Sequence, residues 1–238
     1  MYVHGCSNCC GNSGIERGNR LLILLWCGSL LLLSTMDTNA AYYVHLSKDK
    51  KLLPLLKTIT PRPLKKRKNI CLRLCSSIMS QQLSTKVAEV IFKRFLELYG
   101  GQEPTPQQIL DTPTETLRAI GLSNAKVSYV HNVARFMIEH NATDKMFAKM
   151  ENEDVIAFLT QIKGVGRWTV EMILMFTLGR EDVFAIDDLG IQQGIAKVYG
   201  LDMTDKKTFR ERMLKLSAKW APYRTYACFY LWDYKDNK

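Results

Sequence analysis

Apolar residues recur at helical spacing along this chain from Ser84 onward, and no segment alternates apolar and polar residues as a half-buried strand does. A serine that can cap a helix precedes each of two clear runs, Ser84 and Ser123. The first run places on one face Val87, Ile91, Phe95 and Leu98, and the second places Val127, Val130, Ala134, Met137 and Ile138. The sequence therefore predicts an all-α fold, and 238 residues suffice for one core or two small lobes.

The segment from Ile162 to Asp188, IKGVGRWTVEMILMFTLGREDVFAIDD, holds a glycine turn between two helical patterns. Glycine stops the first helix at Gly164, and both Gly164 and Gly166 can take a positive φ. The amides of the turn and of the next helix's first residues can then face a phosphate oxygen, while Val165 points inward. A glycine turn alone most often only connects two helices, so its continuation decides the interpretation.

The continuation is a helix that is apolar on almost every side, predicted from Arg167 to Leu178 and ended by Gly179. A short loop then leads to Asp187 and Asp188, which open a further helical run from Leu189 to Tyr199. The positive end of a helix dipole favours an ionised carboxylate, although aspartates at such positions often act only as caps.

This order of hairpin, buried helix, loop and paired aspartates resembles the helix-hairpin-helix DNA glycosylase superfamily. GVGRWT followed by VFAIDD is similar to its alkylation-repair branch, the 3-methyladenine DNA glycosylase II group, and the resemblance covers roughly residues 42–234. It implies two helical lobes with a central cleft, the two terminal segments sharing one lobe. We expect lobe one to comprise residues 36–83 and 190–238 and lobe two residues 84–189, with no room for the N-terminal β-rich domain of some relatives.

The resemblance places the catalytic aspartate at Asp188, and we expect Asp187 to be a helix cap. Breaking an N-glycosidic bond builds positive charge on the deoxyribose, which an ionised carboxylate stabilises. Bifunctional members of the superfamily carry a lysine nucleophile after the Gly-Arg pair, where this chain has Trp168. The sequence therefore predicts a monofunctional enzyme in which water attacks, while Lys163, which stands where the family usually has proline, contacts a phosphate.

The resemblance also implies a base pocket formed by Trp168, Trp232 and Met172. An indole face suits stacking on the electron-poor ring of an alkylated purine. Simple core packing is the alternative for each tryptophan, and for Trp232 the neighbouring aromatic residues favour it about equally. Met172 stands where relatives carry an aromatic residue, and the sequence leaves the role of Glu171 open.

The segment from Ile78 to Ser84 resembles the family's wedge loop, with Gln82 at the inserting position and Gln81 beside it. A polar loop between two helices is the alternative. For the DNA backbone we expect contacts from the hairpin residues Gly164, Val165, Gly166 and Arg167.

The net charge of +10, from 33 Lys and Arg against 23 Asp and Glu, suits a polyanionic partner such as nucleic acid. A basic run, Lys65 to Lys68 with Arg73, either tracks phosphates or forms a solvated helix face, and the sequence does not decide between them.

The cysteines do not form a disulfide framework, since Cys6, Cys9, Cys10 and Cys27 lie near the N-terminus, leaving Cys71, Cys75 and Cys228. We expect Cys71 and Cys75 to pack as small apolar side chains. Relatives such as endonuclease III hold an iron–sulfur cluster on four closely spaced C-terminal cysteines. Cys228 stands alone there, so we expect no cluster, no zinc and no diffusible cofactor.

Residues 1–35 differ from the rest of the chain. Arg17 and Arg20 precede an apolar run from Leu21 to Leu33, which read literally is a signal peptide cleaved near Ala41. The run is too short to span a membrane as a helix. We favour instead a spurious leader with the true start at Met36, because the resemblance points to an enzyme that acts on DNA in the bacterial cytoplasm.

Together these features predict a monofunctional, monomeric glycosylase that flips alkylated purines of the 3-methyladenine type out of double-stranded DNA and excises them, with no membrane contact by the mature domain. Two alternatives remain at this point: a glycosylase for deaminated or oxidised bases, and a hairpin DNA-binding module without catalysis.

Overall fold

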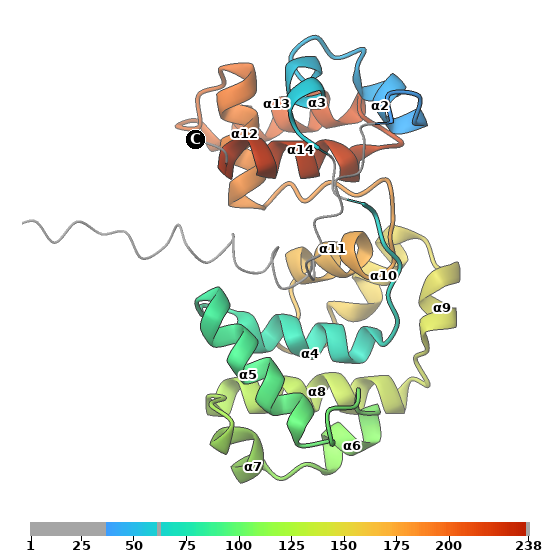
Figure 1. Ribbon diagram of the computed structural model, residues 1–238, viewed down its shortest axis with the longest axis vertical. Coiled ribbons are helices and arrows are strands. Elements are labelled where there is room, and N and C mark those ends of the chain that lie inside the picture. Colours follow the sequence, from blue (N-terminus) through green and yellow to red (C-terminus); the bar gives the residue numbers. More distant parts are fainter. Residues whose placement is uncertain (1–36, 61–62, 237–238) are drawn as a thin grey trace, which may run out of the picture.

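The computed structural model describes residues 37–60 and 63–236, and within these ranges the chain forms helices joined by turns and loops, with no strand (Figure 1). The all-α prediction is therefore confirmed for this part of the chain. The expectations for residues 1–35 and for Met36 as the start fall outside the described residues. None of the described helices is long and apolar enough to cross a membrane.

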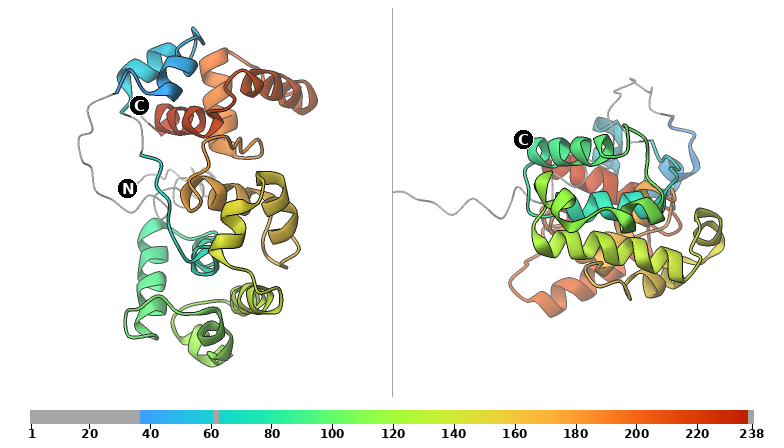
Figure 2. Two further views of the ribbon diagram at one scale, coloured as in Figure 1. Left: turned by 90° about the vertical axis from the view of Figure 1, so that its right-hand side faces the viewer. Right: turned by 90° about the horizontal axis from the view of Figure 1, so that it is seen from below.

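The helices gather in two lobes, which Figure 1 and Figure 2 show from different directions. One lobe combines helices from both ends of the chain: α2 (Ala41–Leu46), α3 (Leu53–Thr58), α12 (Leu189–Tyr199), α13 (Lys206–Ala218) and α14 (Arg224–Asp236). The other holds the helices between them: α4 (Ile70–Ser80), α5 (Thr85–Glu97), α6 (Pro106–Asp111), α7 (Thr114–Ala119), α8 (Asn124–Glu139), α9 (Asp144–Lys149), α10 (Asn152–Leu159) and α11 (Arg167–Phe176).

The structure differs from the expected lobe division at one boundary. Helix α4, assigned to lobe one by the division after residue 83, packs against α5, α8 and α11 of lobe two. Its side chains are apolar on nearly every face, so it needs partners all round. We therefore place the point where the chain passes from the first lobe to the second in the segment that precedes α4. There the backbone N–H of Arg67 donates to the carbonyl of Thr177 at 2.7 Å.

Both predicted serine caps are present. The Ser84 side chain accepts from the Val87 N–H and the Ser123 side chain accepts from the Lys126 N–H, which satisfies one free donor at the start of α5 and of α8.

Two of the four residues predicted to form the apolar face of α5 are buried, and the other two are exposed. Ile91 and Phe95 are buried, together with Ala88, but Val87 and Leu98 are 45% and 37% exposed. The buried stripe is narrow because α5 packs mainly on α4, and Val87 lies one residue, or about 100°, away from Ala88 around the helix.

Close approach of α12 and α14 depends on two glycines one helical turn apart. A Cβ at Gly194 would lie 2.9 Å from the carbonyl oxygen of Leu231, and one at Gly190 would lie 2.9 Å from Cδ1 of Trp232. Glycine at both positions lets the two helices come together, and this brings the side chain of Trp232 to the N-terminus of α12.

Candidate active site

The hairpin between α10 and α11 turns on Gly164, whose φ is +104°. A Cβ there would overlap Cγ of Tyr129, so both the backbone conformation and the space require glycine. Val165 is buried, as predicted, and its N–H donates to the carbonyl of Ile162.

Gly166 corrects one expectation, since its φ is −96° and not positive. It is the N-cap of α11, it offers no side chain to the first N–H groups of that helix, and a Cβ there would meet nothing within 4 Å. The first turn of α11 therefore begins in open space beside unoccupied backbone donors, an arrangement that suits an anion.

The Arg167 side chain is engaged within the protein. Its Nη2 lies 2.6 Å from Oε1 of Glu153, and its Nε lies 3.1 Å from Oε1 of Glu171. In this conformation only the main chain of Arg167 is available for its predicted contact with the DNA backbone. A contact through the guanidinium would require that group to leave Glu153 or Glu171.

Asp188 is the N-cap of α12, and its Oδ1 accepts from the Ile191 N–H at 2.8 Å. The residue is 1% exposed. The loop that precedes it is tied to both neighbouring lobes, as described below, so the carboxylate occupies a fixed place where the chain crosses between them.

Asp187, which we expected to cap this helix, does not do so. Its carboxylate points to solvent and pairs with Arg210 of α13, with both side chains about half exposed. Capping requires the residue immediately before the first helical turn, and that residue is Asp188.

Two indoles converge on Asp188. Nε1 of Trp168 donates to Oδ2 and Nε1 of Trp232 donates to Oδ1, both at 2.8 Å. With the Ile191 N–H, three N–H donors meet this one side chain, and only acceptor oxygens can satisfy them all, which suits a carboxylate. The two predicted pocket residues and the predicted catalytic residue thus form one hydrogen-bonded cluster, reached from the hairpin through Trp168.

The two tryptophans differ in how far they can respond to a ligand. Trp232 is 2% exposed, and its ring stacks with Phe176 and Phe229. Trp168, the second residue of α11, is partly exposed. Met172 is fully buried and shows no surface to a base in this conformation. The pocket roles of these three residues stay predictions. Trp232 both packs in the core and donates a hydrogen bond to the carboxylate of Asp188.

Glu171 is a buried residue of the site whose role the sequence left open. It is 2% exposed, its Oε1 accepts from Arg167, and its Oε2 is buried without a hydrogen-bond partner. Burial raises the pKa of this carboxyl to about 7, against the opposing effect of Arg167. An acidic residue within an otherwise apolar helix was the available signal, since such residues are rarely buried without a reason.

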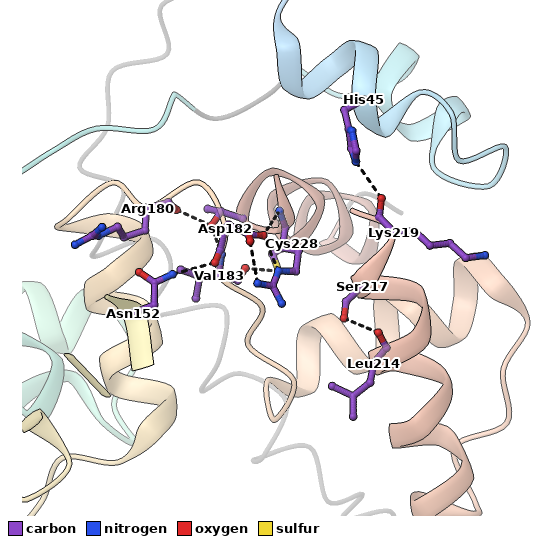
Figure 3. A network of polar contacts seen from close by, with 11 residues as sticks. His45, Asn152, Arg180, Asp182, Val183, Leu214, Ser217, Lys219 and Cys228 are labelled. Carbon is purple, nitrogen blue, oxygen red and sulfur yellow. Dashed lines mark hydrogen bonds and ion pairs between the residues drawn. The ribbon is translucent and has the colours of Figure 1, made fainter. Parts of the chain in front are cut away.

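The loop from Arg180 to Ile186 is held on both sides by polar contacts (Figure 3). Toward α10, the Asn152 side chain donates to the carbonyl of Asp182 at 3.0 Å. Toward α14, the Asp182 carboxylate pairs with Arg224, and Oγ1 of Thr225 bonds both the carbonyl of Arg180 and the N–H of Val183. This network sets the path of the chain into Asp188.

The segment expected to hold the wedge ends α4 and caps α5, as predicted. Gln82 is exposed and has a φ of +59°, which is unusual for a residue other than glycine. Leu83, next to it, packs against the core.

The basic run lies at the far end of α11 from the hairpin. Lys66, Arg67 and Lys68 line a hollow of about 300 Å³, together with Gly179 and Arg180. Arg73 is paired with Glu103. Lys65 to Lys68 precede α4 and belong to no helix, so these four residues do not form the helix face that was one of the two interpretations.

Cys71, Cys75 and Cys228 are free and buried, as the packing interpretation of the first two requires. Among the described residues no group of three or more His, Cys, Asp or Glu side chains is arranged to hold a metal ion. Cys228 lies 3.8 Å from the carbonyl of Val183, and burial raises its pKa, so its surroundings disfavour a thiolate.

The fold and the site together define an all-helical protein in which a helix-hairpin-helix unit stands beside a buried, helix-capping carboxylate. The chain belongs to the HhH-GPD superfamily of base excision DNA repair proteins, whose family model matches residues 75–221.

Similar proteins agree with this assignment. The chain is 40% identical over 185 residues to DNA-3-methyladenine glycosylase 1 of Schizosaccharomyces pombe, covering 77% of this chain and 80% of that protein. The solved structure of 3-methyladenine DNA glycosylase from the same yeast in complex with abasic DNA has a TM-score of 0.72 and 37% identity, and covers 82% of this chain and 96% of that one. A DNA-3-methyladenine glycosidase from Bacillus halodurans has a TM-score of 0.75 and 33% identity, with 84% and 91% covered.

Proposed function

We propose that this protein is a monofunctional DNA glycosylase that hydrolyses the N-glycosidic bond of alkylated purines of the 3-methyladenine type in double-stranded DNA. The observation that carries the proposal is the Asp188 carboxylate, held by two indole N–H groups directly beside the hairpin. The names of its relatives, which act on 3-methyladenine, support the substrate class.

In the proposed reaction the hairpin and the open N-terminus of α11 bind the DNA backbone, and Gln82 fills the space of the extruded nucleotide. As the base leaves, positive charge develops on the deoxyribose and the fixed Asp188 carboxylate stabilises it. The base takes the bonding electron pair with it, the oxygen of a water molecule bonds to C1′ and gives up a proton to the solvent, and an abasic site remains.

Access to Asp188 requires one side chain to move, because the carboxylate is covered in this structure. Trp168 is the better candidate, since it is partly exposed while Trp232 is packed between the helices. We propose that the flipped nucleotide displaces Trp168 from Oδ2, and that the freed indole face then stacks on the cationic base.

The absence of strand cleavage follows from the residue at the nucleophile position. Trp168 has no amine with which to form a Schiff base, and Lys163 lies exposed on the hairpin, where its carbonyl accepts from Asn132. Borohydride trapping on lesion-bearing duplex checks this: we expect no covalent protein–DNA complex, and a trapped complex contradicts monofunctional hydrolysis.

The decisive experiment incubates methylated duplex DNA with the wild type and with Asp188→Asn, and measures free bases by chromatography. Asparagine is also a good N-cap, so the variant keeps the start of α12 while losing the negative charge. We expect release of methylated purines by the wild type and a loss of about a hundredfold or more in the variant. No release by the wild type refutes the enzyme, and equal release by both removes Asp188 from catalysis.

A panel of duplexes carrying 7-methylguanine, hypoxanthine or 8-oxoguanine tests the substrate class. Preference for the methylated purine supports the proposal, and faster release of a deaminated or oxidised base overturns it.

We also propose that the protein acts in the cytoplasm as a monomer, since the hairpin, the wedge and the carboxylate all belong to one chain. Light scattering of the DNA complex measures the number of copies.

A further inference from the structure

The turn between α4 and α5 is held by one cation from a distant part of the sequence. Nζ of Lys126 donates to the carbonyl of Met79 at 2.9 Å and to the carbonyl of Gln81 at 2.7 Å. The Gln81 carbonyl immediately precedes Gln82, and the Met79 carbonyl lies two residues earlier. The position of the turn is therefore fixed to α8, and not only to its neighbours in sequence.

The backbone of this turn needs such support. Gln82 is in the left-handed region with a φ of +59°, which is unfavourable for a residue other than glycine. The turn's own bonds run from the Gln81 N–H to Ile78 at 3.3 Å and from the Leu83 N–H to Ser80 at 3.2 Å. Strained conformations persist where surrounding contacts over-determine them, and here the strain directs an exposed side chain outward.

The position of Lys126 within its own helix is unfavourable. It lies in the first turn of α8, where the helix dipole disfavours a cation, and partial burial lowers its pKa. The C-terminus of α4 in front of it compensates, because the negative end of that helix and its last carbonyls accept a cation. A lysine ammonium has only donors, which matches two carbonyl acceptors.

We propose that Lys126 is a positioning residue for base flipping, which presets the α4–α5 turn so that Gln82 projects in the conformation that fills the gap left by the extruded nucleotide. This inference rests on the proposed function, to which the wedge role of Gln82 belongs. A backbone already held in the conformation that presents Gln82 does not lose that conformational freedom when the side chain enters the duplex.

The test is a double-mutant cycle on single-turnover excision, with Lys126→Met, Gln82→Ala and the double variant. The substrate is a duplex with one 7-methylguanine or hypoxanthine opposite its normal partner, whichever the wild type releases faster. We expect each single variant to be slower by about tenfold. The double variant should be no slower than Gln82→Ala alone, because Lys126 acts only through Gln82.

Lys93→Met is the matched control, since Lys93 is 80% exposed and forms only a surface pair with Glu97. It should excise at the wild-type rate. A second substrate places the same lesion opposite an abasic analogue, where less pairing opposes extrusion. There the loss in Lys126→Met should shrink to within about twofold. Thermal unfolding checks the fold, and Lys126→Gln replaces Lys126→Met if the latter is unfolded at the assay temperature.

The outcomes separate the two proposals. A slow Gln82→Ala with an unchanged Lys126→Met, or with losses that multiply in the double variant, overturns the inference and leaves the proposed function standing. A weaker affinity of Lys126→Met for undamaged duplex, with a salt slope smaller by about 1, makes Lys126 a phosphate contact and also overturns it. An unchanged Gln82→Ala refutes the wedge, and the inference with it. A wild type that releases no base refutes the proposed function itself.

Discussion

Nε1 of Trp232 lies 2.8 Å from Oδ1 of Asp188, although 44 residues separate them in sequence. The bond joins α14, the last described helix, to the residue that ends the second crossing between the lobes and caps α12. It gives the carboxylate a buried donor, and it explains why a tryptophan within an apolar C-terminal helix also belongs to the site.

Replacing Trp232 with phenylalanine should therefore lower both stability and activity. The buried carboxylate loses a donor that water cannot easily replace, which should cost about 1 to 3 kcal/mol. Trp168→Phe should cost less stability, because Trp168 is partly exposed and water can take its place at Oδ2. Chemical denaturation of both variants measures the difference, and an equal cost contradicts this account of the cluster.

Gly190→Ala should damage the site through a single methyl group. A Cβ at that position would lie 2.9 Å from Cδ1 of Trp232 and 3.1 Å from Oδ1 of Asp188. Gly194→Ala is the matched control in the same helix, since its Cβ would meet Leu231 instead. We expect both variants to be less stable than the wild type, despite the better helix propensity of alanine. In the folded protein, Gly190→Ala should slow single-turnover excision more than Gly194→Ala does, because only the methyl group at position 190 would meet the side chains of Trp232 and Asp188.

The two hairpin glycines should respond differently to alanine. Gly164→Ala introduces strain at a φ of +104° and a clash with the ring of Tyr129, so it should destabilise the fold by about 2 kcal/mol or more. Gly166→Ala meets no neighbour and should leave the melting temperature nearly unchanged. It should nevertheless weaken binding to undamaged duplex, because the methyl group stands where the phosphate approaches. Binding of Gly166→Ala as tight as that of the wild type argues against phosphate contact at this turn.

Glu171 should make stability fall as pH rises from about 4.5 to about 7. Its pKa is about 7 in the folded protein against an ordinary value of 4.5, so the folded state binds the proton more tightly within this window. Raising the pH from about 4.5 to about 7 removes a proton that the folded state binds more tightly than the unfolded state does. The free energy of unfolding should therefore fall by about 3 kcal/mol. Glu171→Gln should lose this slope. Glu153→Gln, which changes an exposed partner of Arg167, should keep it, and unfolding free energies across pH 4 to 8 measure both.

Local features of this fold were predictable from the sequence. The caps at Ser84 and Ser123 and the start of α12 depend on side chains within a few residues of the backbone groups they satisfy. The predicted stop at Gly164 was wrong by several residues, because α10 already ends at Leu159. The pair of adjacent aspartates was harder, because either can cap a helix, and only the resemblance selected Asp188 for catalysis.

Relationships between distant segments were not predictable in the same way. Hydrophobic periodicity marks α4 as buried but does not say on which lobe, and it marks Trp232 as apolar without showing that its N–H reaches a carboxylate. The contact of Lys126 with the carbonyl of Gln81 was equally hidden, because main-chain acceptors leave no trace in residue identity.

The shared lobe of the two terminal segments has a consequence for synthesis. Helices α4 to α11 form a continuous stretch of chain and can pack as soon as they have emerged from the ribosome. Among the described helices, α2 and α3 emerge before the others, yet α14, which packs against α3, is made last. The nascent protein therefore carries α2 and α3 without their packing partner through most of translation, and the carboxylate of Asp188 acquires its second indole only when α14 is released.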